Sequence, residues 1–492
     1  MIATPHVDWF AISTILVLLG AAGIALLGAV LVPQRWRRAF AATVAVLGSA
    51  GAIVAAVWLY VDSASGHRVI ADGFYRDRWT ALAQVIICAI ALATALISVE
   101  HIPEEHVSEF FALLLASTAG MAFFVGAANL MTLFLSLEWF SIALYVMCAI
   151  DYDREGSLEA GLKYLIVGSF GSASLLFGSA LVYGATNHIG FAEIAQAVAQ
   201  HGLHGDLLLV LGLAMIIAGL GFKMSAAPFH MWTPDVYEGA PTPLTAFMSS
   251  ATKVAALVLT LRLMRTAFPQ ETHLWSWAFA GIAVASLVIG NFAALVQRNV
   301  KRILAYSSVS HAGFLLIGLS AGTALGARAM MFYLVPYAAM AFGSFAIIAA
   351  RERELGEAVT LENLAGFGWE RPFLGVAMWF FMFGFAGLPL GGGFIGKFYV
   401  LSAAYEHGWT WLVIVGVLAT LVSLYYYLGI VRALYVRPAA TVGAPAIAGG
   451  SPARDPFLHA AVGLALTVSI GSLFAVGPLI TLARHAAASL LF

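Results

Sequence analysis

The stretch 221–253, "GFKMSAAPFHMWTPDVYEGAPTPLTAFMSSATK", places a lysine near each end of an apolar, proline-rich segment. Between Lys223 and Lys253 lie four of the chain's 16 prolines. Proline has no backbone N–H and interrupts helices, so the chain is expected to break and turn here. Cationic side chains on both sides of such a break predict a polar interior inside an otherwise apolar protein.

The composition sets the class of protein around this stretch. Apolar residues make up 62% of the 492 positions, and only 10% are charged. A soluble domain cannot hide so much apolar surface behind so little charge, so we expect an integral membrane protein surrounded by a lipid bilayer. The net charge of −1 gives no indication of a nucleic-acid partner.

Apolar runs of the length needed to cross a membrane recur along the whole chain. They lie near 9–32, 39–61, 79–99, 109–127, 129–150, 158–184, 207–227, 241–264, 275–297, 301–321, 328–350, 373–403, 409–435 and 457–483. The first run is too long for a signal-peptide core and is predicted to be a retained span. The fold class is therefore predicted as all-α, with about 14 transmembrane helices in a single polytopic domain over residues 1–492.

The distribution of basic residues between the loops predicts the orientation. Loops after odd-numbered segments hold 13 of them: Arg35, Arg37, Arg38, Arg154, Arg298, Lys301, Arg302, Arg351, Arg353, Arg371, Arg432, Arg437 and Arg454. The other side holds 7: Arg68, Arg76, Arg78, Arg262, Arg265, Arg328 and Arg484. Because basic loops stay in the cytoplasm, we expect a multi-pass protein of the cell inner (plasma) membrane with both termini outside the cytoplasm.

Four lysines remain, all within apolar segments: Lys163, Lys223, Lys253 and Lys397. Arginine stays protonated in every setting, whereas a desolvated lysine can lose its proton. A lysine at a helix centre costs roughly 2.5–3.5 kcal/mol on insertion scales, so Lys253 needs a partner or a wet cavity. Lys163 lies close to the start of its segment, where snorkelling to the surface is an equal alternative.

Two further polar residues lie at mid-segment. Glu138 is the only acid between Glu109 and Asp151, and it needs a counter-charge as much as Lys223 does. His311 lies in "AYSSVSHAGF" among Ser307, Ser308 and Ser310. Such a histidine is either a hydrogen-bonded core residue or a proton relay, and the sequence leaves both open.

A second interrupted segment resembles the first in design. Lys397 ends "FGFAGLPLGGGFIGK", in which Pro389 and the glycines at 391–393 cannot occupy an ordinary helix interior. Segments 7 and 12 are thus both broken, both carry a lysine, and lie five segments apart. Paired interrupted helices indicate two inverted five-helix repeats, with halves at about 109–265 and 275–435.

No motif for a bound cofactor is evident in the chain. The two cysteines, Cys88 and Cys148, are too few for an iron–sulfur cluster or a disulfide framework, and no nucleotide-binding glycine motif occurs. Histidines at 188, 201 and 204 share one loop with Glu193 and Asp206, which is predicted to be solvated rather than to bind metal. The charge run "RERELGE" at 351–357 is predicted to be a solvated cytoplasmic turn.

Four motifs together resemble one known family. The stretch "APFHMWTPDVYEGAPTPLTAF" at 227–247 resembles the signature of the antiporter-like, proton-translocating membrane subunits of respiratory complex I, an NADH-quinone oxidoreductase. The resemblance extends to "LSLEWFS" at 135–141, "VKRILAYSSVSHAGF" at 300–314 and "GLPLGGGFIGKFYV" at 387–400. It is best to the subunit N branch, because another sister has a glutamate where this chain has Lys397, and the largest sister has a long C-terminal extension.

The resemblance assigns roles to individual residues. It implies that Glu138 is the partner of Lys223, that Lys253 is the central relay, and that Lys397 is the terminal proton donor or acceptor. Similar chains also carry a lysine at the position of Lys163, and His311 matches a histidine on the central polar axis.

The resemblance also implies partners and a division of labour. This chain would be one subunit of a translocase that couples electron transfer from NADH to quinone to proton transport, with no redox chemistry of its own. FMN, the iron–sulfur clusters and the quinone site would belong to other membrane and peripheral subunits of complex I. The alternatives are a subunit of a multisubunit cation/proton antiporter, a scaffold that seals the membrane arm, and an ion channel.

Overall fold

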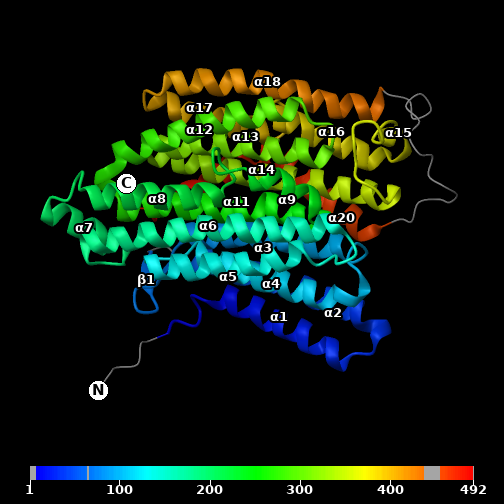
Figure 1. Cartoon of the computed structure of the whole chain (residues 1–492), viewed down its shortest axis with the longest axis horizontal. Helices are drawn as coiled ribbons and strands as arrows, with labels where there is room; N and C mark the ends of the chain where they lie inside the picture. Colours follow the sequence, from blue (N-terminus) through cyan, green and yellow to red (C-terminus); the bar gives the residue numbers. More distant parts are fainter. Residues whose placement is uncertain (1–6, 64–65, 437–454, 491–492) are drawn as a thin grey trace.

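The computed structural model describes residues 7–63, 66–436 and 455–490, and most of these residues are helical. Figure 1 shows the long helices stacked side by side with their axes roughly parallel. A short hairpin of β1 and β2 and the short helix α7 lie at one end of the stack, and α15 lies at the other. This arrangement is that of a helical membrane protein, as the composition predicts.

The elements follow the predicted apolar segments closely. The first half forms α1 (Ser13–Leu31), α2 (Gln34–Asp62), β1 (His67–Val69), β2 (Phe74–Arg76), α3 (Arg78–Ser98), η1 (Glu104–His106), α4 (Val107–Phe124), α5 (Leu130–Cys148), α6 (Glu155–Thr186), α7 (Phe191–His201), α8 (Leu207–Lys223) and α9 (Trp232–Gly239). The second half forms α10 (Thr242–Phe247), η2 (Met248–Thr252), α11 (Lys253–Ala267), η3 (Pro269–Glu271), α12 (Thr272–Leu295), α13 (Val300–Ser320), α14 (Ala324–Leu355), α15 (Phe367–Glu370), α16 (Pro372–Ala386), α17 (Gly392–Glu406), α18 (Thr410–Tyr435), α20 (Pro456–Phe474) and α21 (Val476–Ala487).

The number of spans is settled only in part. Eleven helices in the described part of the chain are long and apolar enough to cross a membrane. Three predicted segments contain shorter apolar helices instead, namely Ser13–Gly28, Leu207–Lys223 and Pro372–Ala386. The multi-pass, predominantly helical architecture is confirmed, whereas the count of 14 and the inverted repeat stay predictions.

Polar caps explain where several apolar helices begin. The side chain of Asn129 accepts a hydrogen bond from the backbone of Thr132 at the start of α5, and Asp206 caps α8 in the same way. Asp77 caps α3, and Asn299 caps α13. Each cap satisfies backbone N–H groups that the first helical turn leaves unpaired.

Both predicted helix breaks are present. The α8 helix ends at Lys223, earlier than the predicted boundary at 227, and the chain resumes helical structure as α9 after an irregular turn. The second break separates α16 from α17, where Gly387 has a φ of +77°, a value that glycine adopts without strain. Backbone groups are therefore released from helical hydrogen bonding at two buried places.

A third irregularity was not predicted. The helix that runs from α10 into α11 contains the π-helical segment η2 directly before Lys253. Every residue in the most apolar window of this helix is buried, and α13 and α14 beside it are almost as buried. Since π-helical segments often occur at functional sites, the core of the protein is also the place to look for its chemistry.

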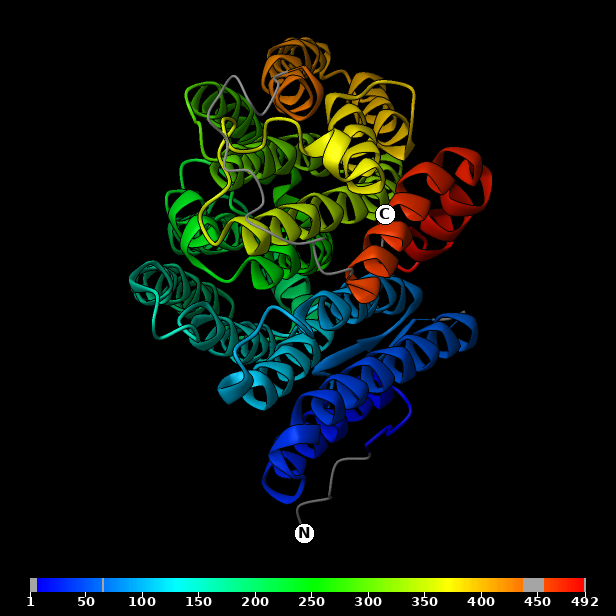
Figure 2. The same ribbon diagram turned by 90° about the vertical axis from the view of Figure 1, so that its right-hand side faces the viewer.

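The outer layers differ in how they close the structure. In Figure 2, α1 and α2 lie at one edge and α18 lies at the other. The C-terminal helices α20 and α21 return to pack against α14 and α3. The N-terminal helices α1 and α2 pack against α3 and α4, whereas the C-terminal helices cover part of the central helix α14.

Some residues assigned to loops are buried within helices. Lys301 is 0% exposed, and Arg262 and Arg351 are each 1% exposed. The guanidinium of Arg262 makes two 2.8 Å hydrogen bonds to the carboxylate of Asp77, which links α11 to the cap of α3. These residues do not belong in a count of solvated loop charges, and Arg437 and Arg454 lie outside the described residues.

The interpretation of 351–357 as a solvated turn was wrong for 351–355, which is helical, although Arg353, Gly356 and Glu357 are exposed as predicted. The α14 helix continues to Leu355, and Arg351 donates hydrogen bonds to the carbonyl of Asn363. The helix continues because its charged side chains find partners on neighbouring elements. The other predicted polar loop, 185–206, contains the amphipathic helix α7, whose Glu193 pairs with Arg68 of β1.

Candidate functional site

Three of the four predicted lysines lie in the protein core. The exposed fractions of Lys223, Lys253 and Lys397 are 2%, 0% and 4%, so none of them snorkels to the surface. Each lies at an irregular place in a helix. Lys223 is the last residue of α8, Lys253 follows η2, and Lys397 lies near the start of α17. The buried ammonium groups thus lie beside irregular places in the helices.

Lys223 is bound by a hydroxyl group within an aromatic cage. Its Nζ donates a 2.6 Å hydrogen bond to Oγ of Ser141 on α5. The rings of Phe140, Tyr145 and Tyr164 have their centroids 5.4–5.6 Å from the same nitrogen. The negative face of an aromatic ring attracts an ammonium group, so this cage offsets part of the cost of burial.

The predicted pair of Glu138 and Lys223 is not in ion-pair contact within the described structure. Oε1 of Glu138 is buried and has no hydrogen-bond partner among the described residues. Ser141, which binds Lys223, lies three residues after Glu138 and therefore on the same side of α5. Sequence reasoning missed Ser141, although this spacing could have drawn attention to it. The switching role of Glu138 stays a prediction.

Lys253 is bound by the end of a broken helix. Its Nζ donates a 2.9 Å hydrogen bond to the carbonyl oxygen of Met224, the C-cap residue of α8. The last carbonyls of a helix lack helical partners and carry partial negative charge. The break after Lys223 therefore supplies the group that holds Lys253, and the two lysines are coupled through adjacent backbone positions.

His311 lies at the centre of a hydroxyl network. Its Nδ1 is 2.7 Å from the hydroxyl of Tyr333, and its Nε2 is 3.0 Å from the hydroxyl of Tyr427. The Tyr427 hydroxyl also contacts Ser307. A tyrosine hydroxyl can donate or accept, and a neutral imidazole does both at once. The arrangement is able to pass a proton from one nitrogen to the other.

A second set of hydroxyls lies between η2 and α13. The Tyr337 hydroxyl donates a 3.1 Å hydrogen bond to the carbonyl of Ser249 in η2 and lies 3.2 Å from Oγ of Ser308. Ser249 is one turn before Lys253, and Ser308 is one turn before His311. The sequence shows these tyrosines only as polar groups within apolar segments, a weak signal that was missed.

Lys397 lies beside the turn of α13 that follows His311. Its Nζ has no hydrogen-bond partner in the part of the chain that the structure describes, and it lies 4.3 Å from the ring centroid of Phe314. Phe314 follows His311 by three residues on α13. An atom added at Gly387 would lie 3.9 Å from the same nitrogen, so Lys397 also borders a helix break.

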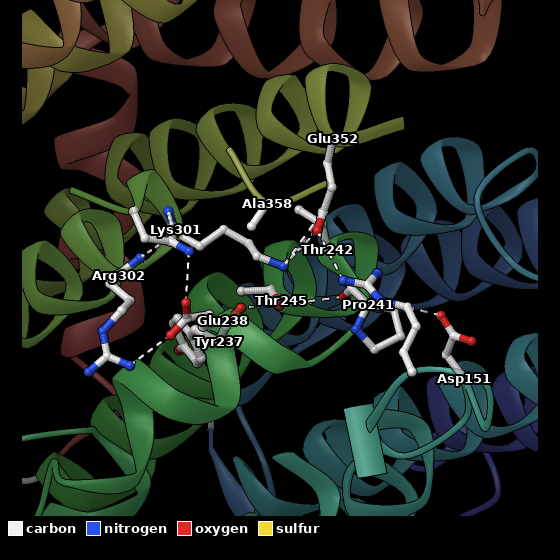
Figure 3. A network of polar contacts seen from close by, with 12 residues as sticks. Asp151, Tyr237, Glu238, Pro241, Thr242, Thr245, Lys301, Arg302, Glu352 and Ala358 are labelled. Atoms are coloured by element: carbon white, nitrogen blue, oxygen red, sulfur yellow. Dashed lines mark hydrogen bonds and ion pairs between the residues drawn. The ribbon is translucent and has the colours of Figure 1, made fainter. Parts of the chain in front are cut away.

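Lys163 does not join the buried lysines. Its side chain is 44% exposed and pairs with Glu159 at 2.6 Å and Asp235 at 2.9 Å. Asp235 also accepts a 2.7 Å hydrogen bond from Arg302, which binds Glu238 as well. Figure 3 shows Arg302 beside Glu238 at this end of α9. The acidic residues of the signature thus form ion pairs that anchor the second half of the broken helix.

The site shows no arrangement typical of a metal centre. Within the described ranges, no three histidine, cysteine, aspartate or glutamate side chains gather in a way that could hold a metal ion. The groups that contact Lys223, Lys253 and His311 are hydroxyls, a carbonyl and aromatic rings. The hydroxyls bind and transfer protons, and the expectation that cofactors lie in other subunits stays a prediction.

Comparisons with known proteins agree on the class of this chain. Residues 127–423 match the family model described as NADH:quinone oxidoreductase/Mrp antiporter, transmembrane. The chain is 41% identical over 425 residues to NADH-quinone oxidoreductase subunit N of Trichlorobacter lovleyi, covering 86% of each protein. It is 42% identical over 396 residues to subunit N 1 of Rhizobium meliloti, covering 80% of this chain and 82% of that one.

Solved structures share the fold. A chain of respiratory complex I from Thermus thermophilus with bound aureothin superimposes with a TM-score of 0.79 at 30% identity, covering 96% of this chain and 99% of that one. A chain of the Mrp complex from Dietzia sp. superimposes with a TM-score of 0.86 at 22% identity, covering 98% and 97%. The second likeness extends to the fold alone.

Proposed function

The chain belongs to the NADH-quinone oxidoreductase subunit N family, and from that premise we propose that Lys223, Lys253, His311 and Lys397 carry protons through it. The chain is a proton-translocating membrane subunit, associated with the other subunits of complex I. Its activity is that of the whole translocase, in which electron transfer from NADH to quinone drives proton movement across the membrane.

The observation that carries this proposal is the buried line of exchangeable groups. It runs from Lys223 and Ser141 past Lys253 and Met224 to the hydroxyls around His311, and on to Lys397. A scaffold has no need for three buried lysines at three irregular helix positions. Each such lysine is costly in a membrane, which supports a transport role.

The partners of the lysines suit them to repeated proton exchange. Lys223 is held by a hydroxyl, Lys253 by a carbonyl, and Lys397 by an aromatic ring. A buried ammonium held in this way can release its proton without leaving an uncompensated carboxylate behind, as breaking a buried ion pair would. The three lysines are therefore suited to transferring protons rather than to holding a permanent positive charge.

The proposed order of steps begins at the cytoplasmic side. A proton reaches Lys223, passes to Lys253, crosses the hydroxyls around His311, and leaves near Lys397 for the other side. Glu138 acts as the switch, because movement of its carboxylate toward Lys223 would hold the proton there. Moving one charge against a membrane potential of about 200 mV requires about 4.6 kcal/mol, which redox chemistry elsewhere in the complex must supply.

The proposal also covers the cofactors of the complex and the position of this chain in the membrane. FMN, the iron–sulfur clusters and the quinone site lie in other subunits, and this chain performs no electron transfer. It resides in the cell inner membrane with both termini outside the cytoplasm. This division of labour follows from the resemblance to the membrane subunits of complex I.

Sequence identity distinguishes this function from the nearest alternative, which is a subunit of a multisubunit cation/proton antiporter. The likeness to the Mrp complex is 22% in identity, whereas the subunit N relatives reach 41% and 42% over most of their length. A cation antiporter would also move sodium in vesicles without NADH. That outcome would favour the rival.

The test uses the assembled complex in inside-out membrane vesicles. We expect Lys253→Met and Glu138→Gln to lower NADH-driven proton uptake several-fold while the complex still assembles. NADH oxidation by an artificial acceptor reports assembly independently of pumping. If both variants pump as well as the unmodified complex, these residues are not the path.

A further inference from the structure

A polar pocket lies beside the start of α10, on the side predicted to face the cytoplasm. It is lined by residues from four separate parts of the chain, including His101, Asp151, Arg154, Thr242 and Glu352. Its walls come from loops after odd-numbered segments and from the ends of α10 and α14. Water and protons on that side of the membrane have access to the carboxylate of Glu352, which is 12% exposed.

Directly behind Glu352 lies a lysine that the path described above does not use. Lys301 is 0% exposed, and its Nζ is 3.3 Å from Oε1 of Glu352 and 3.1 Å from Oγ1 of Thr242. The Thr242 hydroxyl donates to the same carboxylate. Figure 3 shows Thr242 and Glu352 meeting beside Lys301. The pocket is lined by Glu352 and Thr242 but not by Lys301, so these two residues separate the ammonium from solvent.

Beyond Lys301 a seam leads toward the centre of the protein. Lys301, Leu304 and Ser308 recur at three- and four-residue spacing on one face of α13, and Glu352, Phe345 and Tyr337 recur at seven- and eight-residue spacing on one face of α14. A small cavity with room for about one water molecule lies between them. Its lining includes Leu304, Ser308, Tyr337 and Phe345.

The inner end of the seam reaches the proton path itself. Tyr337 and Ser308, which line the cavity, are the residues whose hydroxyls connect η2 to the helix of His311. The seam therefore joins the central path between Lys253 and His311 and bypasses Lys223. A purely structural ion pair between Lys301 and Glu352 would not require a cavity at this position.

We propose that the seam between α10, α13 and α14 is a second proton-uptake branch, gated by Glu352 and Lys301. The branch rests on the proposed function, since it feeds the same path. Lys301 passes a proton to water in the cavity and on to the hydroxyls of Tyr337 and Ser308. Glu352 then takes a proton from the pocket and passes it to the neutral Lys301, while the hydroxyls release a proton to the central path, so that each group is restored and one proton moves inward.

The first experiment removes the proton-carrying ability of the gate, together with the carboxylate charge that pairs with Lys301 and Arg154. Glu352→Gln in the assembled complex keeps an oxygen that can accept from Thr242 and Lys301. Glu354→Gln is the matched control, because Glu354 is 13% exposed on the same helix and pairs with Arg351 and Arg371 away from the pocket. We expect NADH-driven proton uptake to fall at least two-fold for Glu352→Gln, to stay unchanged for Glu354→Gln, and to recover in part for Glu352→Asp.

A second variant blocks the seam without touching the gate. Leu304→Phe adds bulk to the cavity, and Ile317→Phe adds it on the opposite side of the same helix. We expect Leu304→Phe to lower proton uptake at least two-fold and Ile317→Phe to leave it unchanged. If Glu352→Gln prevents assembly, the comparison of Leu304→Phe with Ile317→Phe tests the branch instead.

The results for these variants distinguish a failure of the uptake branch from a failure of the proposed function. Lys253→Met serves as the reference in the same vesicles. If Lys253→Met abolishes pumping while Glu352→Gln and Leu304→Phe match their controls, the branch is wrong and the central path stands. If Lys253→Met pumps normally, the proposed function itself is wrong.

Discussion

The ammonium of Lys253 donates a 2.9 Å hydrogen bond to the carbonyl of Met224, the residue at which α8 ends directly after Lys223. One helix break thus carries two functions. It ends α8 so that Lys223 lies at the terminus, and it frees a carbonyl that holds the next lysine. Any motion of the break changes the setting of both lysines together, which is what a coupled proton path needs.

Lys253→Arg tests whether this position must release its proton. Arginine keeps the positive charge and the hydrogen-bond donors, but it stays protonated in every protein setting. We therefore expect the complex to assemble and NADH-driven proton uptake to fall several-fold, as for Lys253→Met. Proton uptake in inside-out vesicles measures this, with artificial-acceptor activity as the measure of assembly. Normal pumping by the arginine variant would mean that only the charge of Lys253 matters.

Ser141→Ala tests the hydroxyl that binds Lys223. Loss of a hydrogen bond to a charged group costs about 1.5–3 kcal/mol, so we expect slower pumping with the complex intact. Ser136→Ala is the matched control, because Ser136 lies on the same helix and, among the described residues, its hydroxyl donates to backbone carbonyls of that helix alone. The rates of proton uptake of the two variants should differ several-fold. Equal rates would remove Ser141 from the path.

Tyr427→Phe tests the hydroxyl network around His311. The change removes the partner of Nε2 and of Ser307, leaving both buried without it. We expect proton uptake to fall several-fold. Tyr425→Phe provides the comparison, because Tyr425 lies two residues away on α18 and is 74% exposed. If Tyr427→Phe behaves like Tyr425→Phe, His311 is a core histidine rather than a relay.

The sequence predicts what is local and misses what depends on packing. Apolar run lengths, prolines and glycines are local signals, and they predicted the helices, both breaks and the burial of Lys253 and Lys397. The groups that hold these lysines come from distant helices, and no pattern near Lys253 indicates Met224. Lys301 shows the same limit, since its position at the start of a segment suggests a loop. Glu352, 51 residues away, and Thr242, 59 residues away, hold its ammonium group in the interior.

Arg262→Leu tests the buried ion pair that joins α11 to α3. The change leaves the Asp77 carboxylate, 2% exposed, without its partner, and losing one member of a buried pair costs about 3–5 kcal/mol. We expect a large drop in the thermal stability of the purified complex, measured by unfolding temperature. Arg68→Gln, which disrupts the partly exposed contact with Glu193, should cost at most about 1 kcal/mol. Similar losses in both variants would contradict the structural role of Arg262.

Cysteine labelling tests the orientation in the membrane. The native cysteines, Cys88 and Cys148, are both buried, so the background is low. Gln200→Cys places an exposed thiol on α7, and Asp153→Cys places one between α5 and α6. We expect a membrane-impermeant thiol reagent to label Gln200→Cys in intact cells or spheroplasts and Asp153→Cys only in inside-out vesicles. The excess of basic residues in the loops after odd-numbered segments favours this result. The buried Arg262, Lys301 and Arg351 do not count toward that excess. Reversed labelling would place the Glu352 pocket on the outer face, where it could not take up cytoplasmic protons.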